Sequence, residues 1–270
     1  MHGTLAGYAL LDVLGEGAMG TVYGAVREID GMAVALKVLR SELSSEGEIR
    51  HRFTHEARAL VELRHPNLVE SIELGEVEGT LYLALRHVEG RPVSALLTAG
   101  TRIELAEAVQ IACGVGNGLA AMHRAGLVHR DVKPANVILG ADRSPTLVDL
   151  GLARAAHWTQ LTMTGLVVGT MDYLAPELVL GEEASPASDV YSLGCTLYEM
   201  LCGQPPFRHA TIGETMKAQV DEQPPDPRAL RPEVGEPLAF TLLRLLEKDP
   251  AERPTAAGAV RLLRATTVRA

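Results

Sequence analysis

The sequence has few of the residues on which several protein classes depend. Its three cysteines, Cys113, Cys195 and Cys202, are too few and too scattered for a disulfide framework or a zinc site. Each lies in an apolar helical pattern, so we expect buried free thiols and a reducing, cytoplasmic location. No signal peptide opens the chain, and no apolar run approaches the ~20 residues of a membrane span, so we expect no membrane segment.

Positive charge is also scarce. Acidic residues outnumber basic ones and the net charge is −9, which argues against a nucleic-acid partner. Lysine occurs only at Lys37, Lys133, Lys217 and Lys248, in a chain that otherwise uses arginine. At 270 residues, 47% of them hydrophobic, the chain can bury a large core or form two lobes that share a cleft.

A dense polar cluster, His129–Asn136, is followed by a second one, Asp149-Leu150-Gly151. An apolar run leads away from the first cluster, another leads back to the second, and the turn-rich stretch between them predicts a strand hairpin. Both clusters then lie at one end of a small ribbon, where Asp131, Asn136 and Asp149 provide a base and two ligands for a hard cation. Taken singly, each of these residues is more often a turn former.

A glycine-rich stretch, Gly15-Glu16-Gly17-Ala18-Met19-Gly20, lies near the start of the chain. Such patterns occur in two folds, and the flanking sequence separates them. In a dinucleotide-binding unit the glycines run into a helix, whereas here the β-branched stretch Thr21–Val26 and a second strand, Met32–Leu39, follow. The pattern therefore predicts a strand–loop–strand hairpin whose backbone N–H groups can approach phosphate oxygens.

Two charged residues are expected to meet across the N-terminal region. On the second strand, Ala35 and Lys37 point the same way by alternation, although a lone strand lysine is about as often an exposed edge residue. Ser44–Leu63 predicts a helix, with Ser44 or Ser45 as N-cap and an inward apolar stripe. Glu56 lies within that stripe and needs a cation, for which Lys37 is the natural partner.

These motifs, in this order, resemble the protein kinase family, and the octet from His129 to Asn136 resembles bacterial Hanks-type Ser/Thr kinases best. The resemblance covers about 8–264. It implies an α+β, bilobal protein-kinase-like fold, with a small antiparallel β-sheet N-lobe that carries one main helix (about 8–85). A hinge (86–90) and a larger helical C-lobe (about 91–264) follow.

The resemblance implies ATP-dependent transfer of the γ-phosphoryl group to Ser/Thr hydroxyls of protein substrates. Asp131 accepts the hydroxyl proton, Lys133 neutralises the transferring group, and Asn136 and Asp149 hold Mg²⁺, with Mn²⁺ as an alternative. Lys37 reaches the phosphates and pairs with Glu56, whereas His129 is a packing residue. The residues implied to bind ATP are Leu14, Gly15, Glu16, Gly17, Ala18, Met19, Gly20, Thr21, Val22, Ala35, Lys37, Leu85, Arg86, Val88 and Ile138.

The stretch 153–168 resembles an activation loop, with Thr162 and Thr164 ahead of Thr159 as sites of autophosphorylation. Arg130 is the expected partner of the new phosphate, and self-association would assist the reaction. Two residues depart from common kinase patterns. Arg86 replaces the usual acidic residue of the hinge, and Ala135 gives no support for a preference for arginine in the substrate.

The C-terminal region reads as a set of helices. Leu105–Arg124 contains three glycines that indicate either tight packing or a loosely specified helix. The expected features are a buried helix over Asp189–Leu201, whose Asp189 binds N–H groups of the catalytic loop, an ion pair between Glu177 and Arg253, a connection over Gln223–Pro232, and closing helices over Leu238–Glu247 and Thr255–Arg264.

Two functions from other classes remain open at this point. A pseudokinase would bind ATP or partners without phosphoryl transfer, but Lys37, Glu56, Asp131, Asn136 and Asp149 are all present, which counts against it. A small-molecule kinase of related fold is disfavoured by Ala175-Pro176-Glu177 and the Thr-rich stretch, which suit peptide docking. The sequence does not reveal the physiological substrate or the upstream signal.

Overall fold

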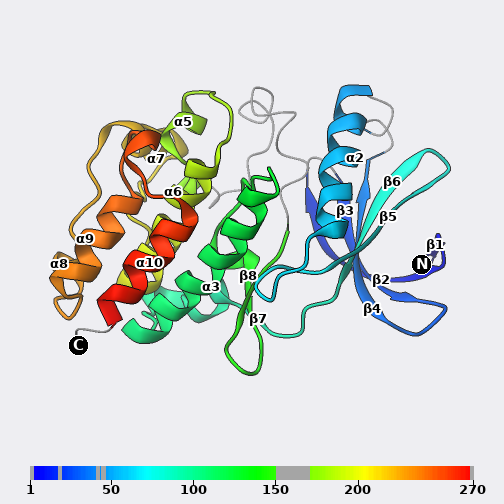
Figure 1. The fold of residues 1–270 in the computed structure, drawn as a ribbon, viewed down its shortest axis with the longest axis horizontal. Helices are drawn as coiled ribbons and strands as arrows, with labels where there is room; N and C mark the ends of the chain where they lie inside the picture. The colour runs from blue at the N-terminus through cyan, green and yellow to red at the C-terminus, as the bar shows by residue number, and fades with distance from the viewer. Residues whose placement is uncertain (1–2, 18–19, 41–42, 44–46, 150–170, 268–270) are drawn as a thin grey trace.

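The computed structural model describes residues 3–17, 20–40, 43, 47–149 and 171–267, and it confirms the α+β, two-lobe architecture. A twisted antiparallel sheet with helix α2 forms the N-terminal lobe, and a mostly helical C-terminal lobe lies beside it (Figure 1). The strands of the large sheet follow the order β1-β2-β3-β4-β6-β5. They are β1 Thr4–Leu5, β2 Tyr8–Gly17, β3 Gly20–Arg27, β4 Ala33–Leu39, β5 Ser71–Val77 and β6 Thr80–Arg86.

Strand β4 shows why this sheet has two different faces. Val34 and Leu36 are fully buried in a small cluster with Tyr8. Alternation turns Ala35 and Lys37 to the opposite face, toward the main core. The sequence predicts that these two residues share a face, and the structure pairs them with Leu85 and Leu83 of β6.

Helix α2, Gly47–Glu62, packs against the sheet through its apolar stripe. Ile49, Phe53, Ala57 and Leu60 are all buried, so the predicted helical period is confirmed. The two serines proposed as its N-cap lie outside the described residues.

The C-terminal lobe is built around two long helices in contact, α3 (Leu105–Arg124) and α6 (Pro186–Cys202), with the others placed about them (Figure 1). Its helices are α3 Leu105–Arg124, α5 Pro176–Val179, α6 Pro186–Cys202, α7 Ile212–Asp221, α8 Pro227–Leu230, α9 Glu236–Leu245 and α10 Ala256–Thr267. Short 3-10 turns are η1 Val93–Leu96, η2 Thr98–Gly100, η3 Pro134–Asn136, η5 Met171–Tyr173 and η6 Pro250–Glu252. A small sheet joins β7 Arg91–Pro92, β8 Val137–Leu139 and β9 Pro145–Leu147.

Most helix positions agree with the sequence predictions, and the differences lie at the ends. Helix α3 has the predicted bounds, whereas α6 begins at Pro186, three residues before the expected start. The reason is local, because Ser185 and Ser188 form a capping box that starts the helix earlier. The predicted connection 223–232 contains the short helix α8.

The glycines of α3 are explained by close packing. A Cβ atom on Gly114 would lie 2.3 Å from Cγ of Pro145. One on Gly116 would lie 2.7 Å from a methyl group of Val260, and one on Gly118 2.9 Å from Leu68. Three neighbouring elements therefore approach α3 where it has no side chain, which decides between the two alternatives left open by the sequence.

Helix α3 is also long and apolar enough to cross a membrane by length and composition, with a mean hydropathy of 1.2 in its most apolar window. The sequence pattern predicted no such segment. Within the structure 67% of that window is buried, which is the usual state of a core helix.

The two lobes are also joined by main-chain hydrogen bonds outside the linker. The Val69 N–H donates to the Leu147 carbonyl at 3.0 Å, and the Leu147 N–H donates to the Asn67 carbonyl at 2.9 Å. The Asn67 side chain adds a bond to the Pro145 carbonyl at 2.8 Å. The chain just after α2 is thereby fixed to β9, which leads directly to Asp149.

Candidate active site

The first polar cluster ends on the hairpin that the sequence predicts. Strands β8 and β9 pair antiparallel, with Val137 opposite Leu147. The Val148 N–H donates to the Asn136 carbonyl at 2.8 Å, which holds the two polar clusters at the same end of the ribbon.

Asp131 lies at the centre of this cluster and is 6% exposed. Its Oδ2 lies 2.9 Å from Lys133 Nζ and accepts a hydrogen bond of 2.9 Å from the Asn136 amide. The same amide nitrogen donates to the Asp131 carbonyl at 2.8 Å. An ammonium and an amide therefore orient a nearly buried carboxylate, as a positioned general base requires.

Asp189, near the start of α6, binds the main chain of the loop that carries His129 and Arg130. Its carboxylate accepts from the main-chain N–H groups of His129 and Arg130, both at 2.8 Å, and from His123 Nε2 at 2.8 Å. The predicted role of Asp189 is confirmed. Arg130 has a positive φ of 66°, a strained conformation that these bonds stabilise.

His129 is a packing residue in this structure. Its side chain is fully buried and its Nε2 lies 3.1 Å from the Val148 carbonyl oxygen. Burial lowers the pKa of His129, although Asp189 and Asp131 oppose the shift. A buried, neutral imidazole already engaged with the backbone is poorly placed to act as a base.

Lys37 and Asp149 meet across the two lobes. Lys37 Nζ lies 2.8 Å from Asp149 Oδ1, although the two residues are 112 positions apart in the chain. Asp149 has a positive φ of 54°. The second polar cluster therefore faces the β4 lysine, which is the juxtaposition on which the sequence interpretation depends.

The oxygen atoms at this place suit a hard cation. Asn136 donates through its nitrogen, which leaves the amide oxygen directed elsewhere and without a hydrogen bond among the described residues. Asp149 adds a carboxylate that is 46% exposed. One amide oxygen and one carboxylate are ligands that Mg²⁺ accepts, so the residues present fit the ion that the sequence implies.

The expected ion pair between Lys37 and Glu56 is not formed, and this prediction was wrong for the structure in hand. Both carboxylate oxygens of Glu56 accept from Arg130 Nη1 at 2.9 Å, while Lys37 contacts Asp149. Burial raises the pKa of Glu56 and the Arg130 charge opposes that rise. A half-buried carboxylate needs a cation, and the guanidinium from the catalytic loop supplies it.

The residues predicted to contact ATP are found along two strand pairs and the linker. The described part of the glycine-rich stretch lies at the β2–β3 turn, where Gly17 pairs with Gly20. A Cβ on Gly20 would lie 2.0 Å from the Val38 carbonyl oxygen, so only glycine fits there. Ala35 pairs with Leu85, while Thr21 and Val22 pair with Val38 and Lys37.

The linker between the lobes runs past β8. Gly90 has a φ of 152°, and a Cβ there would lie 2.2 Å from the Leu139 carbonyl and 2.8 Å from Ile138. Ile138 is therefore next to the end of the linker. Arg86 stands where the resemblance implies an acidic hinge residue, and its side chain donates to Glu70 at 2.6 Å.

Several predicted residues lie outside the described part of the chain. They are Ala18, Met19, Leu150, Gly151, Thr159, Thr162 and Thr164. The described chain resumes at Met171 with η5 and α5.

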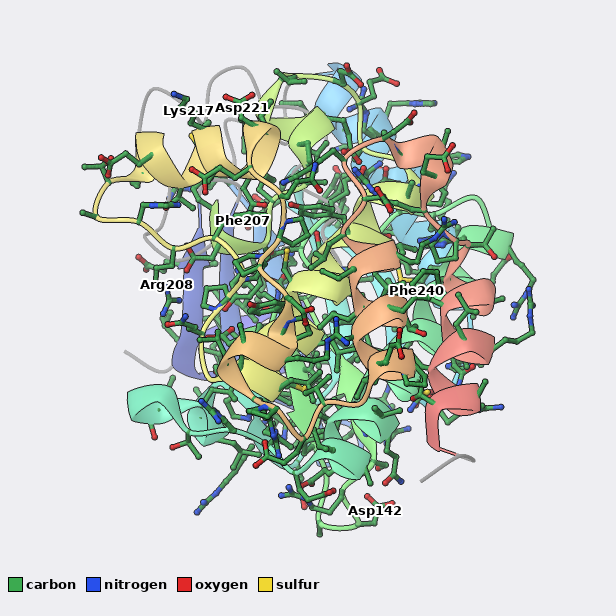
Figure 2. The ribbon with its side chains drawn as sticks, turned by 90° about the vertical axis from the view of Figure 1, so that its left-hand side faces the viewer. Asp142, Phe207, Arg208, Lys217, Asp221 and Phe240 are labelled. Carbon is green, nitrogen blue, oxygen red and sulfur yellow. The ribbon has the colours of Figure 1, made fainter. Side chains whose placement is uncertain are left out.

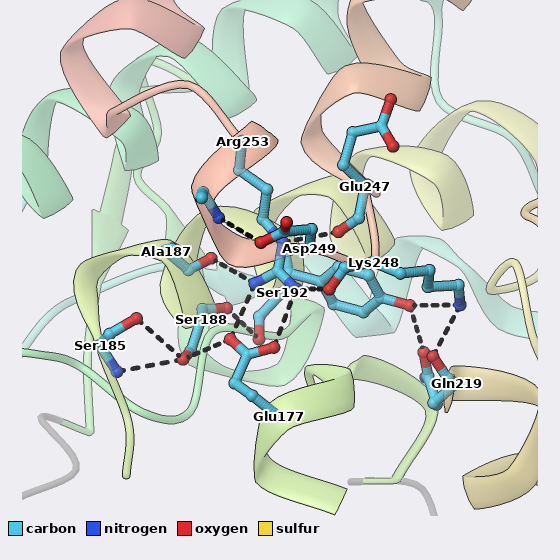
Figure 3. Close-up of polar contacts among 12 residues, drawn as sticks. Glu177, Ser185, Ala187, Ser188, Ser192, Gln219, Glu247, Lys248, Asp249 and Arg253 are labelled. Carbon is cyan, nitrogen blue, oxygen red and sulfur yellow. Dashed lines mark hydrogen bonds and ion pairs between the residues drawn. The ribbon is translucent and has the colours of Figure 1, made fainter. Parts of the chain in front are cut away.

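The ion pair predicted between Glu177 and Arg253 is confirmed (Figure 3). Arg253 donates to both carboxylate oxygens at 2.8 Å, and Ser188 adds a bond to Glu177 at 2.7 Å. Arg253 also donates to carbonyls of Ala187, Glu247 and Lys248. One guanidinium thus joins α5, α6 and the chain before η6.

The residues that hold η5 were not predicted from the sequence. Tyr173 donates to Glu199, Arg208 binds Asp172 at 2.7 Å, and Gln219 donates to two carbonyls of the turn. A signal was present, since Gln219 interrupts the inward face of a helical pattern. Its partners could not be named without coordinates.

The chain is similar to known proteins over nearly its whole length. The family model described as the protein kinase domain matches residues 8–262. The chain is 40% identical over 262 residues to serine/threonine-protein kinase PknA of Mycobacterium tuberculosis and 38% identical over 253 residues to PknE of Mycobacterium bovis. These matches cover 94% and 93% of this chain, but only 60% and 44% of PknA and PknE.

Solved structures give the same relationship. The kinase domain of Mycobacterium tuberculosis PknI superposes with a TM-score of 0.75 at 29% sequence identity. That match covers 98% of this chain and 97% of the PknI domain.

Proposed function

Because this chain belongs to the protein kinase family, we propose that it transfers the γ-phosphoryl group of ATP to serine and threonine hydroxyls of proteins. The observation that carries the proposal is the contact of 2.8 Å between Lys37 and Asp149, beside the cluster of Asp131, Lys133 and Asn136. This arrangement gathers the charges that phosphoryl transfer requires from elements far apart in the sequence. The catalytic unit is proposed to cover 8–264.

Each residue of the site has a distinct proposed role. Asp131 orients the substrate hydroxyl and accepts its proton, while Lys133, already 2.9 Å from that carboxylate, offsets charge on the transferring group. Lys37 binds phosphate oxygens, and Asn136 and Asp149 hold Mg²⁺, with Mn²⁺ as the alternative. The bound ion neutralises negative charge on the phosphates. The protein acts mainly by positioning and electrostatics.

The test is incubation with labelled ATP, Mg²⁺ and dephosphorylated casein, next to Asp131→Asn. Asn keeps the shape of the side chain but cannot accept the proton, so we expect a loss of label transfer by roughly 10²–10⁴-fold. A wild-type chain that binds ATP without labelling casein would favour the pseudokinase. Labelling of a small-molecule acceptor alone would favour the small-molecule kinase.

Activation by autophosphorylation at Thr162 or Thr164 is part of the proposal. Arg130 is the expected partner of the phosphate, yet here it holds Glu56 at 2.9 Å. A phosphate dianion competes for the same guanidinium. Loss of that contact leaves the Glu56 carboxylate without its cation, and Lys37 is the alternative partner.

Two measurements test this activation. Mass spectrometry of protein expressed without phosphatase is expected to show phosphate on one of the two threonines. In Arg130→Met, the ratio of activity between phosphorylated and phosphatase-treated protein should fall toward one, because neither form has the guanidinium. A fully active, unmodified wild type would refute the proposal.

The remaining parts of the proposal concern the partners of the protein and its location in the cell. Protein substrates are the proposed partners, with self-association during autophosphorylation. The three cysteines are free and buried, which supports a proposed cytoplasmic location.

A further inference from the structure

The polar side chain of Gln219 on α7 is fully buried and makes three hydrogen bonds. Its amide nitrogen donates to the carbonyls of Met171 at 3.1 Å and Asp172 at 2.9 Å. Its amide oxygen accepts from the Tyr191 hydroxyl at 2.6 Å. Both N–H groups of the amide donate and its oxygen accepts. The flipped amide would direct its oxygen at the two carbonyls, so only this orientation satisfies them.

Lys248 holds the main chain of α7 at the same place (Figure 3). Its ammonium donates to the Gln219 carbonyl at 2.7 Å and lies 3.3 Å from the Tyr191 hydroxyl. It also lies over the ring of Phe207, 4.0 Å from the ring centre. The end of α7 is thus anchored to α6, while Lys217 and Asp221 project from its outer side (Figure 2).

The turn η5 is held from both sides. From α7, Gln219 takes the carbonyls of Met171 and Asp172. From α6, Ser192 donates to the Tyr173 carbonyl at 2.7 Å. Asp189, three residues earlier on α6, binds the catalytic loop, so both segments have the same helix as their reference.

We propose that Gln219 is a positioning residue for docking of the protein substrate along the segment 171–177. The inference rests on the proposed function. The turn η5 directly follows the Thr-rich stretch and precedes Pro176, where peptide docking is expected. Gln219 sets how far η5 lies from α6, and therefore where a docked hydroxyl lies relative to Asp131.

This role differs from simple packing. Leucine in place of Gln219 fills a similar volume but removes the side-chain donor of the Asp172 carbonyl and the acceptor of the Tyr191 O–H group. The Met171 carbonyl keeps only the longer bond from the Leu174 N–H, at 3.2 Å. The turn must then shift or admit water, while Lys37, Asp131 and Asp149, on other elements, keep their contacts. Substrate docking should suffer and ATP binding should not.

The experiment compares wild type, Gln219→Leu and Gln110→Leu in steady-state kinetics with casein and with ATP as the varied substrate. Gln110 is exposed on α3 and receives the same chemical change far from η5. We expect KM for casein to rise by roughly tenfold or more in Gln219→Leu, since small displacements of bound substrate weaken productive binding. KM for ATP should stay within about twofold, and Gln110→Leu should match wild type.

Two further variants keep the test decisive if Gln219→Leu folds poorly. Gln219→Glu keeps the acceptor for Tyr191 but loses the donors to both carbonyls, so it should share the casein defect. Tyr191→Phe removes the hydroxyl that orients the amide, together with its contact to Lys248, but keeps both bonds from Gln219 to η5. It should shift KM for casein in the same direction by less.

The outcomes separate the two proposals. An active wild type with unchanged KM for casein in folded Gln219→Leu and Gln219→Glu would overturn the positioning role alone. Equal changes in KM for casein and for ATP would reduce Gln219 to a core residue. A wild type that does not phosphorylate casein would overturn the proposed function and this inference with it.

Discussion

The ion pair between Glu177 and Arg253 shows how burial sets the contribution of a single contact. The two side chains are 5% and 0% exposed, and four further hydrogen bonds, one from Ser188 and three to main-chain carbonyls, satisfy their remaining polar atoms. Arg253→Leu should lower the free energy of unfolding by about 3–5 kcal/mol, because it leaves a buried carboxylate without its cation. Urea unfolding measures the change. The double variant with Glu177→Gln should recover part of the loss, and a double variant no more stable than Arg253→Leu would contradict this explanation.

The same pair gives the protein a pH dependence at the acid end. Burial raises the pKa of Glu177, but the hydrogen bonds from Arg253 and Ser188 outweigh it and hold the pKa below its ordinary value of 4.5. The unfolded chain therefore binds the proton first as the pH falls, so the stabilisation is present above about pH 4.5 and is lost below it. Unfolding free energies measured from pH 6 to pH 3 should fall less steeply in the double variant Glu177→Gln with Arg253→Leu than in wild type. Parallel curves would show that Glu177 titrates normally.

At the residue scale, the sequence was sufficient for contacts that depend on motif chemistry. Asp131, Lys133 and Asn136 lie within one octet, so their proximity follows from local chain geometry. The partner of Glu56 did not follow, because Lys37 and Arg130 are both cations within reach of α2 and only the placement of the lobes decides between them.

At the scale of elements, α3 shows how packing outweighs helix propensity. Alanine normally stabilises a helix interior by about 1 kcal/mol relative to glycine, but Cβ on Gly114 would lie 2.3 Å from the rigid ring of Pro145. Gly114→Ala should therefore lower Tm. Gly213→Ala on α7 is the matched control, since a Cβ there meets nothing within 4 Å, and it should leave Tm unchanged or raise it. A stabilising Gly114→Ala would show that β9 yields easily.

Element positions were largely predictable because amphipathic periods and caps are local. Helix α3 has the bounds expected from its pattern, and α6 differs by three residues at its start, where Ser185 caps it early, and by one residue at its end. The hairpin of β8 and β9 followed from its turn residues. The tie between α7 and η5 could not be predicted, because Gln219 and Met171 are 48 positions apart and a lone buried glutamine has no preferred partner.

At the scale of the molecule, the contact between Lys37 and Asp149 joins the lobes where ATP and Mg²⁺ are proposed to bind. A ligand that binds only the folded protein stabilises it by about 2.7 kcal/mol at 100 times its Kd. ATP with Mg²⁺ should therefore raise Tm, and EDTA should remove most of the increase. Asp149→Asn should reduce the Mg²⁺-dependent part while leaving the apo protein folded. An equal ATP shift with and without Mg²⁺ would contradict the assignment of Asn136 and Asp149 as ligands.

The two-lobe architecture itself could be predicted because the motifs follow a fixed order along the chain. The relative placement of the lobes could not. It depends on side chains such as Glu56, which pairs with Arg130 and also lies near the charges of Arg52 and His55.

The main-chain bonds that join Asn67 and Val69 to Leu147 restrict how α2 can move. They fix the chain immediately beyond Glu62, at the C-terminal end of the helix. That end is therefore more restricted than the N-terminal end near Gly47. A rotation of α2 about this end would carry Ile49 and Phe53 through a wider arc than Leu60. A ligand bound beneath the first turns of α2, near Ile49, would therefore restrict this rotation strongly. The same ligand bound near Leu60 would restrict it little.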